Sequence, residues 1–311
     1  MRASFLPNST FLPTAAGMPG NSPFSPQASA APTSLEDSVA PLVFPVIEPT
    51  CSGLGELPQI CLPETVPVWG TDFARVNMAE VVDIANQIIM RGQPSYFVTA
   101  NLNYLMLAER NPCLRTVNRD AAAVLADGYP IVMRSRCGVD PLPERVAGAD
   151  LIVELARLSA TQGHRIYFLG AAPGVADAAA TELRRQFPNV QISGCYSPPF
   201  RPLSDEENQA MLKNIRYAKT DILLVAFGQP KGELWIHENY QKLGVPLSIQ
   251  LGASFDFLAG TAQRAPQIVQ QLGAEWLYRS ILEPRRLAPR YAKNILFLAR
   301  ALMYDVKQLL G

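Results

Sequence analysis

The chain has 311 residues, 48% of them hydrophobic, which is enough for one large α/β domain with additions or for two smaller domains. Its 27 basic residues balance its 27 acidic residues, so the composition argues against binding of nucleic acid through bulk charge. The five cysteines form no CxxC pair and there are only two histidines, which argues against a metal site and favours reduced thiols in a cytosol.

Residues 1–64 are rich in Pro, Ser, Ala and Thr and show no sustained hydrophobic period. Such a segment buries too little apolar surface to offset its ordering entropy, so we predict a largely disordered leader. No apolar run reaches the roughly 18–20 residues of a membrane-spanning helix, and the first ten residues lack the apolar core of a signal peptide. These features predict a cytoplasmic protein.

Between residues 65 and 272, short apolar runs alternate with amphipathic stretches. The predicted strands are residues 66–69, 95–99, 121–126, 165–169, 190–195, 221–227 and 247–251. The predicted helices are residues 78–90, 103–109, 131–137, 149–162, 175–186, 204–217 and 233–243. This alternation predicts a Rossmann-like α/β core, in which a mainly parallel sheet carries helices on both faces. The most apolar run, residues 221–227, is expected at the centre of the sheet.

Asp127 follows the predicted strand at residues 121–126. Open α/β sheets bind ligands at the carboxyl ends of their strands, so this carboxylate is a candidate to face a substrate. Gly128 stops the strand, and Pro130 suits the first turn of a helix. Because Asp-Gly is also a common turn, Asp127 could instead be a turn residue and helix cap.

Thr99 and Asn101 also follow a predicted strand, and their short polar side chains suit a sugar hydroxyl. Capping of the next helix is an equally good explanation of both residues. Arg145 lies in a polar turn, where it could bind a phosphate or pair with Glu144 or Asp150 at the surface. The sequence around Arg145 favours the salt bridge.

Gly170 opens a glycine turn that would let a phosphate approach the backbone N–H groups of the next helix. The turn matches neither GxGxxG nor a Walker loop, which argues against a dinucleotide or an ATPase. Gln229 and Glu233 follow the central predicted strand, at the same edge of the sheet.

From Trp276 onward, bulky apolar residues alternate with cations that include Arg279 and Arg286. We predict a basic, amphipathic helical appendage over residues 273–311. Its pattern suits a helix in the headgroup region of an anionic bilayer, which would place the protein peripherally on the inner face of the plasma membrane. Packing on its own domain, or on a second subunit in a homo-oligomer, would use the same apolar stripe.

Several short blocks, in order along residues 66–300, resemble the WecG/TagA/CpsF glycosyltransferases (glycosyltransferase family 26). The first blocks are Thr99-Ala100-Asn101, Asp127-Gly128, Pro143-Glu144-Arg145-Val146 with Gly148, Phe168-Leu169-Gly170 with Pro173-Gly174, and Gly228 with Pro230, Glu233 and Trp235. The longest block comprises Gly252 with Ser254-Phe255-Asp256-Phe257, Ala259-Gly260, Arg264-Ala265-Pro266, Gly273, Glu275-Trp276, Tyr278-Arg279, Glu283-Pro284 and Arg286.

The resemblance implies an inverting transferase that needs neither metal nor cofactor. It would move an N-acetylmannosamine-type or related sugar from a UDP-sugar donor to a polyprenyl-diphosphate-linked sugar acceptor, in cell-surface or exopolysaccharide synthesis. Asp127 corresponds to the proposed general base of that family. Thr99 and Asn101 match its TAN motif, and Arg145 matches its ERV motif. Arg279 and Arg286 match arginines of the appendage that are thought to close over the site and meet the diphosphate.

The physical requirements of the reaction agree with these assignments. A base must take the acceptor hydroxyl proton as the anomeric C–O bond to UDP breaks. The departing diphosphate gains charge and needs cations or N–H donors, for which Arg145, Arg279, Arg286 and the glycine turns are the candidates. We therefore predict Asp127 and Thr99 as catalytic, and Asn101, Arg145, Gly170, Gln229, Glu233, Arg279 and Arg286 as substrate-binding.

Two positions depart from the family pattern. Gly232 stands where the family usually has a glutamine, and a glutamine occurs instead at Gln229. Pro289 precedes Arg290 where paired arginines are common. The donor sugar therefore does not follow from the resemblance. A nucleotide-binding oxidoreductase and a noncatalytic membrane-associated scaffold are the alternative functions.

Overall fold

The computed structural model describes residues 62–271 and 274–310, except for the side chains of residues 267, 271, 286 and 308–310. All of these residues belong to one compact unit, Gly55–Gly311. The predicted leader lies almost entirely outside the described residues, so its disorder stays a prediction. The domain boundary predicted near residue 272 also stays a prediction.

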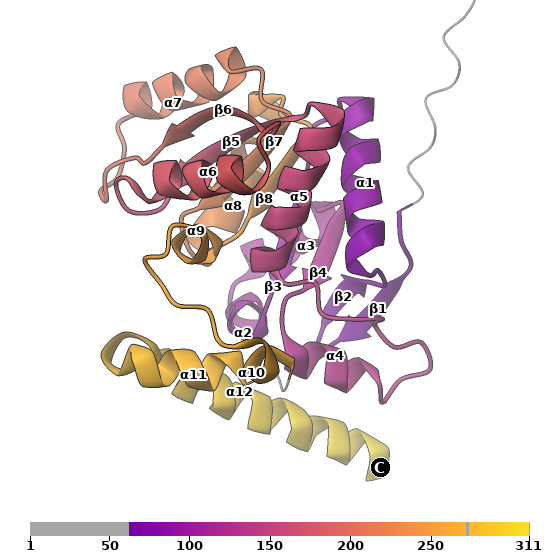
Figure 1. The fold of residues 1–311 in the computed structure, drawn as a ribbon. Coiled ribbons are helices and arrows are strands. Elements are labelled where there is room, and N and C mark those ends of the chain that lie inside the picture. Colours follow the sequence, from indigo (N-terminus) through magenta and orange to yellow (C-terminus); the bar gives the residue numbers. More distant parts are fainter. Residues whose placement is uncertain (1–61, 272–273, 311) are drawn as a thin grey trace, which may run out of the picture. The chain divides into compact units, whose positions relative to one another are not determined.

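A six-stranded sheet forms the core, with the strand order β4-β3-β8-β7-β5-β6 (Figure 1). Every neighbouring pair is parallel, which confirms the predicted Rossmann-like class. The strands are β3 (Ser95–Ala100), β4 (Ala123–Ala126), β5 (Arg165–Gly170), β6 (Gln191–Tyr196), β7 (Ile222–Ala226) and β8 (Leu247–Gln250). As expected from its continuous apolar run, β7 lies in the interior of the sheet.

Twelve helices lie in the described part of the chain. The first six are α1 (Met78–Arg91), α2 (Leu102–Arg110), α3 (Pro112–Asp120), α4 (Tyr129–Ser135), α5 (Gly148–Gln162) and α6 (Val175–Gln186). The others are α7 (Asp205–Tyr217), α8 (Lys231–Leu243), α9 (Ser254–Leu258), α10 (Gln267–Gln271), α11 (Glu275–Leu282) and α12 (Pro284–Leu310). The predicted capping box at Ser204 is present, because its side chain and that of Glu207 bond each other's backbone N–H at the start of α7.

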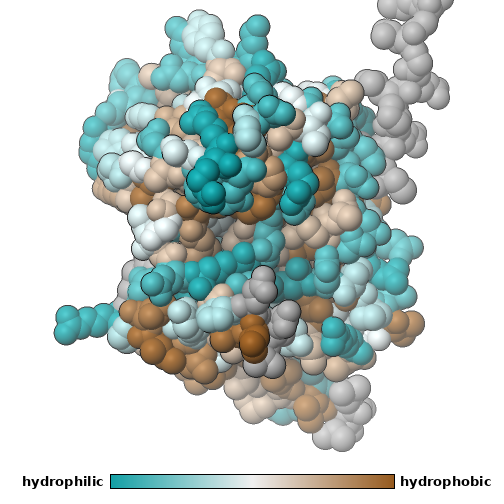
Figure 2. Space-filling model, viewed as in Figure 1, coloured by the Kyte–Doolittle hydropathy of each residue, from teal (hydrophilic) through white to brown (hydrophobic). Residues whose placement is uncertain are grey.

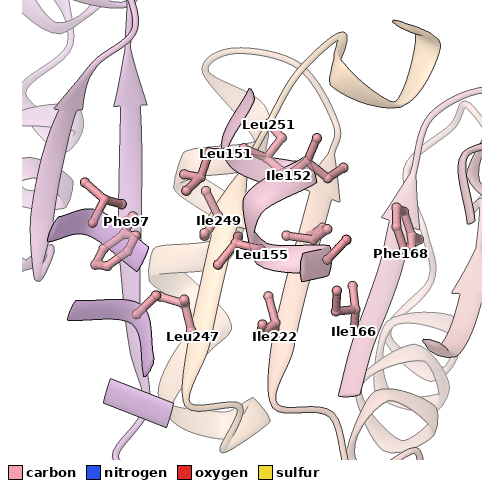
Figure 3. Close-up of a cluster of buried hydrophobic side chains, with 14 of the residues drawn as sticks. Phe97, Leu151, Ile152, Leu155, Ile166, Phe168, Ile222, Leu247, Ile249 and Leu251 are labelled. Atoms are coloured by element: carbon pink, nitrogen blue, oxygen red, sulfur yellow. The ribbon is translucent and has the colours of Figure 1, made fainter. Parts of the chain in front are cut away.

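Hydrophobic clusters cover both faces of the sheet. On one face, α1, α5, α6 and α9 pack on the strands, and the buried residues shown in Figure 3 include Phe97, Leu155, Ile166, Phe168 and Ile249. On the other face, α2, α3, α7 and α8 pack on the alternate strand residues. Each fully buried side chain of this size contributes about 1.5–3 kcal/mol. Because helices cover both faces, a ligand is expected at the carboxyl ends of the strands.

Four elements were absent from the sequence prediction, namely the strand β2 and the helices α3, α9 and α10. The predicted strand at residues 66–69 is confirmed as β1 (Thr65–Val68), but it pairs with β2 (Thr71–Ala74) in a separate antiparallel hairpin. Trp69 and Gly70 connect the two strands with positive φ angles of 48° and 78°, as a tight type I′ turn requires. The helix α3 was also missed, since it is short and mainly polar.

The last helices lie along the end of the sheet, next to α2 and α4 (Figure 1). The 27-residue helix α12 continues through Pro289, so this departure from the family pattern does not end the helix. In the described part of the chain, no helix combines the length and apolarity needed to cross a bilayer.

Candidate active site

A cavity of about 570 Å³ opens at the carboxyl ends of β3, β4, β7 and β8, and α11 and α12 line its opposite side. This volume lies within the usual range for small-molecule sites, and the location is the one predicted for ligands of an open α/β sheet. Of the predicted site residues, the cavity brings together Thr99, Asn101, Asp127, Arg145, Gln229 and Arg279.

Asp127 lies half-buried at the end of β4 and reaches the cavity. The alternative that it caps the following helix is wrong, because the N-cap of α4 is Gly128 and no side chain caps that helix. The carboxylate lies instead by the start of α5, where the Gly148 N–H bonds to it. A helix N-terminus favours a negative charge, so α5 stabilises the ionised form of Asp127.

Burial raises the pKa of the Asp127 carboxyl to about 7, and Arg145 and the Gly148 N–H oppose this rise. Removal from water disfavours the charged form of a carboxyl group, whereas a neighbouring cation favours it. A carboxylate of this pKa is a stronger base than an ordinary aspartate, and about half of it is ionised at neutral pH. Asp127 thus has the properties of a general base.

Arg145 is held beside Asp127 by the backbone, since Val146 N donates to Ala126 O at 3.0 Å. Its guanidinium pairs with Glu275 of α11, with Nη1 and Oε2 3.4 Å apart. Pairing with Glu144 or Asp150 at the surface, which the local sequence favoured, is therefore wrong. Arg145 lines the cavity as a half-buried cation.

Asp150 pairs instead with Arg264, through two hydrogen bonds of 2.6 and 2.7 Å. Arg264 lines the cavity, and so does Arg290 of α12. Both were given no role from the sequence. Arg264 occurs in a family block, and Arg290 follows the unusual Pro289, but neither pattern says which way the side chain points.

Asn101 and Thr99 both line the cavity and both have a local bond as well. The Asn101 side chain accepts from Tyr104 N at 3.1 Å and so caps α2, which was one of the two explanations of this residue. The Thr99 hydroxyl donates to the main-chain oxygen of Gln250 at 2.8 Å. Gln229 accepts from Asn103 Nδ2 at 3.0 Å, and this bond links β3–α2 to the loop after β7.

Two of the predicted substrate-binding residues lie outside the residues that line the cavity. A Cβ atom at Gly170 would lie 2.8 Å from Ala226 O, so the close approach of β7 requires this glycine. Glu233 is only 2% exposed within α8. Burial raises the pKa of its carboxyl to about 8, despite opposing contributions from its own backbone N–H, Gln229 and Arg290.

The appendage contributes part of the cavity wall. Arg279 of α11 lines it and stacks over the Phe257 ring at 5.0 Å, and α12 contributes Arg290, Tyr291 and Asn294. The side chain of Arg286 lies outside the described residues, so its predicted contact with the diphosphate stays a prediction. In the described part of the chain, no three His, Cys, Asp or Glu side chains lie close enough to hold a metal ion.

Comparison with known proteins identifies the family of this chain. Residues 66–310 match the family model of the glycosyl transferase WecG/TagA/CpsF family. The chain is 30% identical to the N-acetylglucosaminyldiphosphoundecaprenol N-acetyl-beta-D-mannosaminyltransferase of Bacillus spizizenii, over 76% of this chain and 93% of that protein. It is 28% identical to the enzyme of the same name from Staphylococcus aureus, over 71% of this chain and 86% of that protein. The chain belongs to the WecG/TagA/CpsF family of glycosyltransferases.

Proposed function

We propose that this glycosyltransferase moves an N-acetylmannosamine-type or related sugar from a UDP-sugar to a polyprenyl-diphosphate-linked acceptor, with Asp127 as the general base. The observation that carries the proposal is the Asp127 carboxylate, which has a pKa of about 7 and reaches a cavity also lined by arginines. The relatives are named as enzymes that transfer N-acetylmannosamine to N-acetylglucosaminyldiphosphoundecaprenol. The dinucleotide and scaffold alternatives have no comparable support.

In the proposed reaction, Asp127 takes the proton of the acceptor hydroxyl. The acceptor oxygen forms a bond to the anomeric carbon while the bond between that carbon and the UDP oxygen breaks, and the electron pair leaves with UDP. Attack from the face opposite the leaving group inverts the anomeric centre. Positioned proton transfer of this kind typically contributes about 10²- to 10⁴-fold to the rate.

The charge that develops on the diphosphate requires fixed cations nearby. Arg145 lies next to Asp127 and pairs with Glu275, and Arg279 and Arg290 come from the helices on the opposite side of the cavity. These arginines can stabilise the leaving group without a metal ion. Because Arg279 and Arg290 come from α11 and α12, the appendage forms part of the proposed catalytic site.

A lipid-linked acceptor requires the protein to work at a membrane surface, and we propose the inner face of the plasma membrane. Apolar side chains gather over the α11–α12 region in Figure 2. They include Leu277, Ile281, Leu282, Ile295 and Leu296, and exposed cations such as Arg285 and Lys293 lie on the same helices. Exposed apolar side chains with neighbouring cations favour binding to anionic lipid.

The transfer reaction is tested by UDP release from a panel of UDP-sugars, with polyprenyl-diphosphate-linked N-acetylglucosamine as acceptor. We expect acceptor-dependent release with at least one donor, and a loss of about 10²- to 10⁴-fold in Asp127→Asn. Asp83→Asn is the matched control, because Asp83 is exposed on α1 and lies outside the cavity. Undiminished turnover in Asp127→Asn would remove this residue from the role of base.

Membrane binding is tested by sedimentation with anionic vesicles. Ile281 and Leu296 are each 71% exposed, so glutamate at both positions should weaken sedimentation strongly while UDP binding is retained. Wild-type sedimentation by this double variant would contradict binding through the α11–α12 face. Sedimentation without vesicles shows whether the same face instead holds a homo-oligomer together.

A further inference from the structure

Gly232, in the first turn of α8, packs directly against the side chain of Gln250 at the end of β8. A Cβ atom at residue 232 would lie 2.0 Å from Gln250 Oε1 and 2.4 Å from its Cδ. Gln250 is only 1% exposed, so its side chain has little room to move away. The backbone φ of Gly232 does not require glycine. Glycine is therefore needed at residue 232 because the carboxamide of Gln250 occupies the space of a side chain.

Gln250 ends a strand that forms part of the floor of the cavity. Gln250 lines the cavity, and its strand β8 pairs with β3 on one side and β7 on the other. Phe227 N donates to Gln250 Oε1 at 3.3 Å, which connects the amide to the loop after β7. The amide nitrogen Nε2 is buried and has no hydrogen-bond partner in the described part of the chain. An unpaired buried donor costs about 1–3 kcal/mol, so such groups usually have a partner in the working state.

Gln229 does not offer a comparable free amide. Its Oε1 accepts from Asn103, and its Nε2 lies 3.5 Å from the main-chain oxygen of Thr99. The carboxamide of Gln250 instead occupies the place where the side chain of a glutamine at residue 232, the usual residue of the family pattern, would begin. The absence of a side chain at Gly232 therefore leaves the space that the amide of Gln250 occupies.

We propose that Gln250 is a substrate-contacting residue whose Nε2 donates to an uncharged oxygen of the bound sugar nucleotide. The inference rests on the proposed function, since it names a contact within that same cavity. The groups that contact Gln250 are uncharged: the Thr99 hydroxyl donates to its main-chain oxygen, Phe227 N donates to Oε1, and Gly232 packs on the carboxamide. A neutral surrounding suits a carbonyl or hydroxyl oxygen of the sugar or of the nucleoside rather than the diphosphate.

Calorimetric titration with UDP and with UDP-N-acetylmannosamine tests the proposal on the full-length protein. Gln250→Met keeps the volume of the side chain and removes the amide, so we expect an affinity loss of about 10-fold. A loss confined to the UDP-sugar places the contact on the sugar, and a loss with both ligands places it on the nucleoside. Equal affinity of Gln250→Met and the wild type for both ligands would overturn the proposal.

A reciprocal swap tests the pairing of the two positions. Gly232→Gln alone should weaken binding by 10-fold or more, because two side chains then compete for one space. The double variant G232Q/Q250G again carries one amide in that space, so it should bind clearly more tightly than Gly232→Gln. No improvement of the double variant over Gly232→Gln would contradict the pairing, provided that thermal unfolding shows both to be folded. A wild type that binds neither ligand would instead contradict the proposed function.

Discussion

Asp305, near the end of α12, accepts two hydrogen bonds from the guanidinium of Arg134 on α4, with N–O distances of 2.6 and 2.9 Å. Trp69 Nε1 donates to the same carboxylate at 3.0 Å. The helix α4 begins directly after Asp127 and Gly128, and α12 lines the cavity that contains Asp127. These bonds therefore connect α12, which lines the cavity, to α4, which begins beside the proposed base Asp127.

We expect Asp305→Asn to loosen α12 and to lower the free energy of unfolding by roughly 1–3 kcal/mol, a value between those of exposed and buried ion pairs. Amide hydrogen exchange over residues 284–310 should accelerate, and the KM for the lipid-linked acceptor should rise. Arg300→Gln is the control, since it removes the exposed pair with Glu109 and should cost less than about 1 kcal/mol. Unchanged exchange in Asp305→Asn would show that other contacts hold α12 in place.

The rate of transfer should increase with pH through about 7, because Asp127 must lose its proton to act as a base. The measurement is kcat/KM between pH 5.5 and 8.5, at constant ionic strength. Arg145 lowers the pKa of Asp127, so Arg145→Gln should move the increase to higher pH. A flat profile from pH 6 to 8 would contradict titration of this carboxyl in the reaction.

Asp127 should destabilise the folded protein at neutral and alkaline pH. Its pKa is about 7 in the folded protein against an ordinary value of 3.8. Between these values the folded state binds more protons than the unfolded state, so the free energy of unfolding falls as pH rises. Asp127→Asn should therefore be more stable than the wild type at pH 8, by roughly 1–3 kcal/mol, and nearly equal to it at pH 4. Denaturant unfolding at the two pH values measures this difference, and a gain of the same size at pH 4 would refute the explanation.

Glu233 should also lower the free energy of unfolding as pH rises, but over a different pH range. Burial of the carboxylate raises its pKa to about 8 from 4.5, and its own backbone N–H and Gln229 offset this only in part. The stability cost therefore grows between pH 4.5 and 8. We expect Glu233→Gln to raise the melting temperature at pH 8 by a few degrees, with a smaller gain at pH 5. Glu238→Gln, at an exposed position on the same helix, is the matched control and should change neither value.

The sequence by itself determined the alternation of strands and helices, the central place of residues 222–226 and the position of Asp127 at a strand end. Each of these features depends on residues that lie close together in the chain. Apolar periodicity predicts the elements, and glycine, proline and capping residues predict where they end. The strand β2 and the helices α9 and α10 are too short to carry much periodic signal, and the helix α3 escaped prediction because most of its residues are polar.

Only the tertiary structure decided which side chains meet in the cavity. Arg145 pairs with Glu275, 130 residues away, rather than with the acids next to it in sequence. The packing of Gly232 against Gln250 likewise depends on how α8 lies on β8. Such contacts follow from the packing of whole elements, which local patterns do not specify, because the same amphipathic helix can bury its apolar face against several partners.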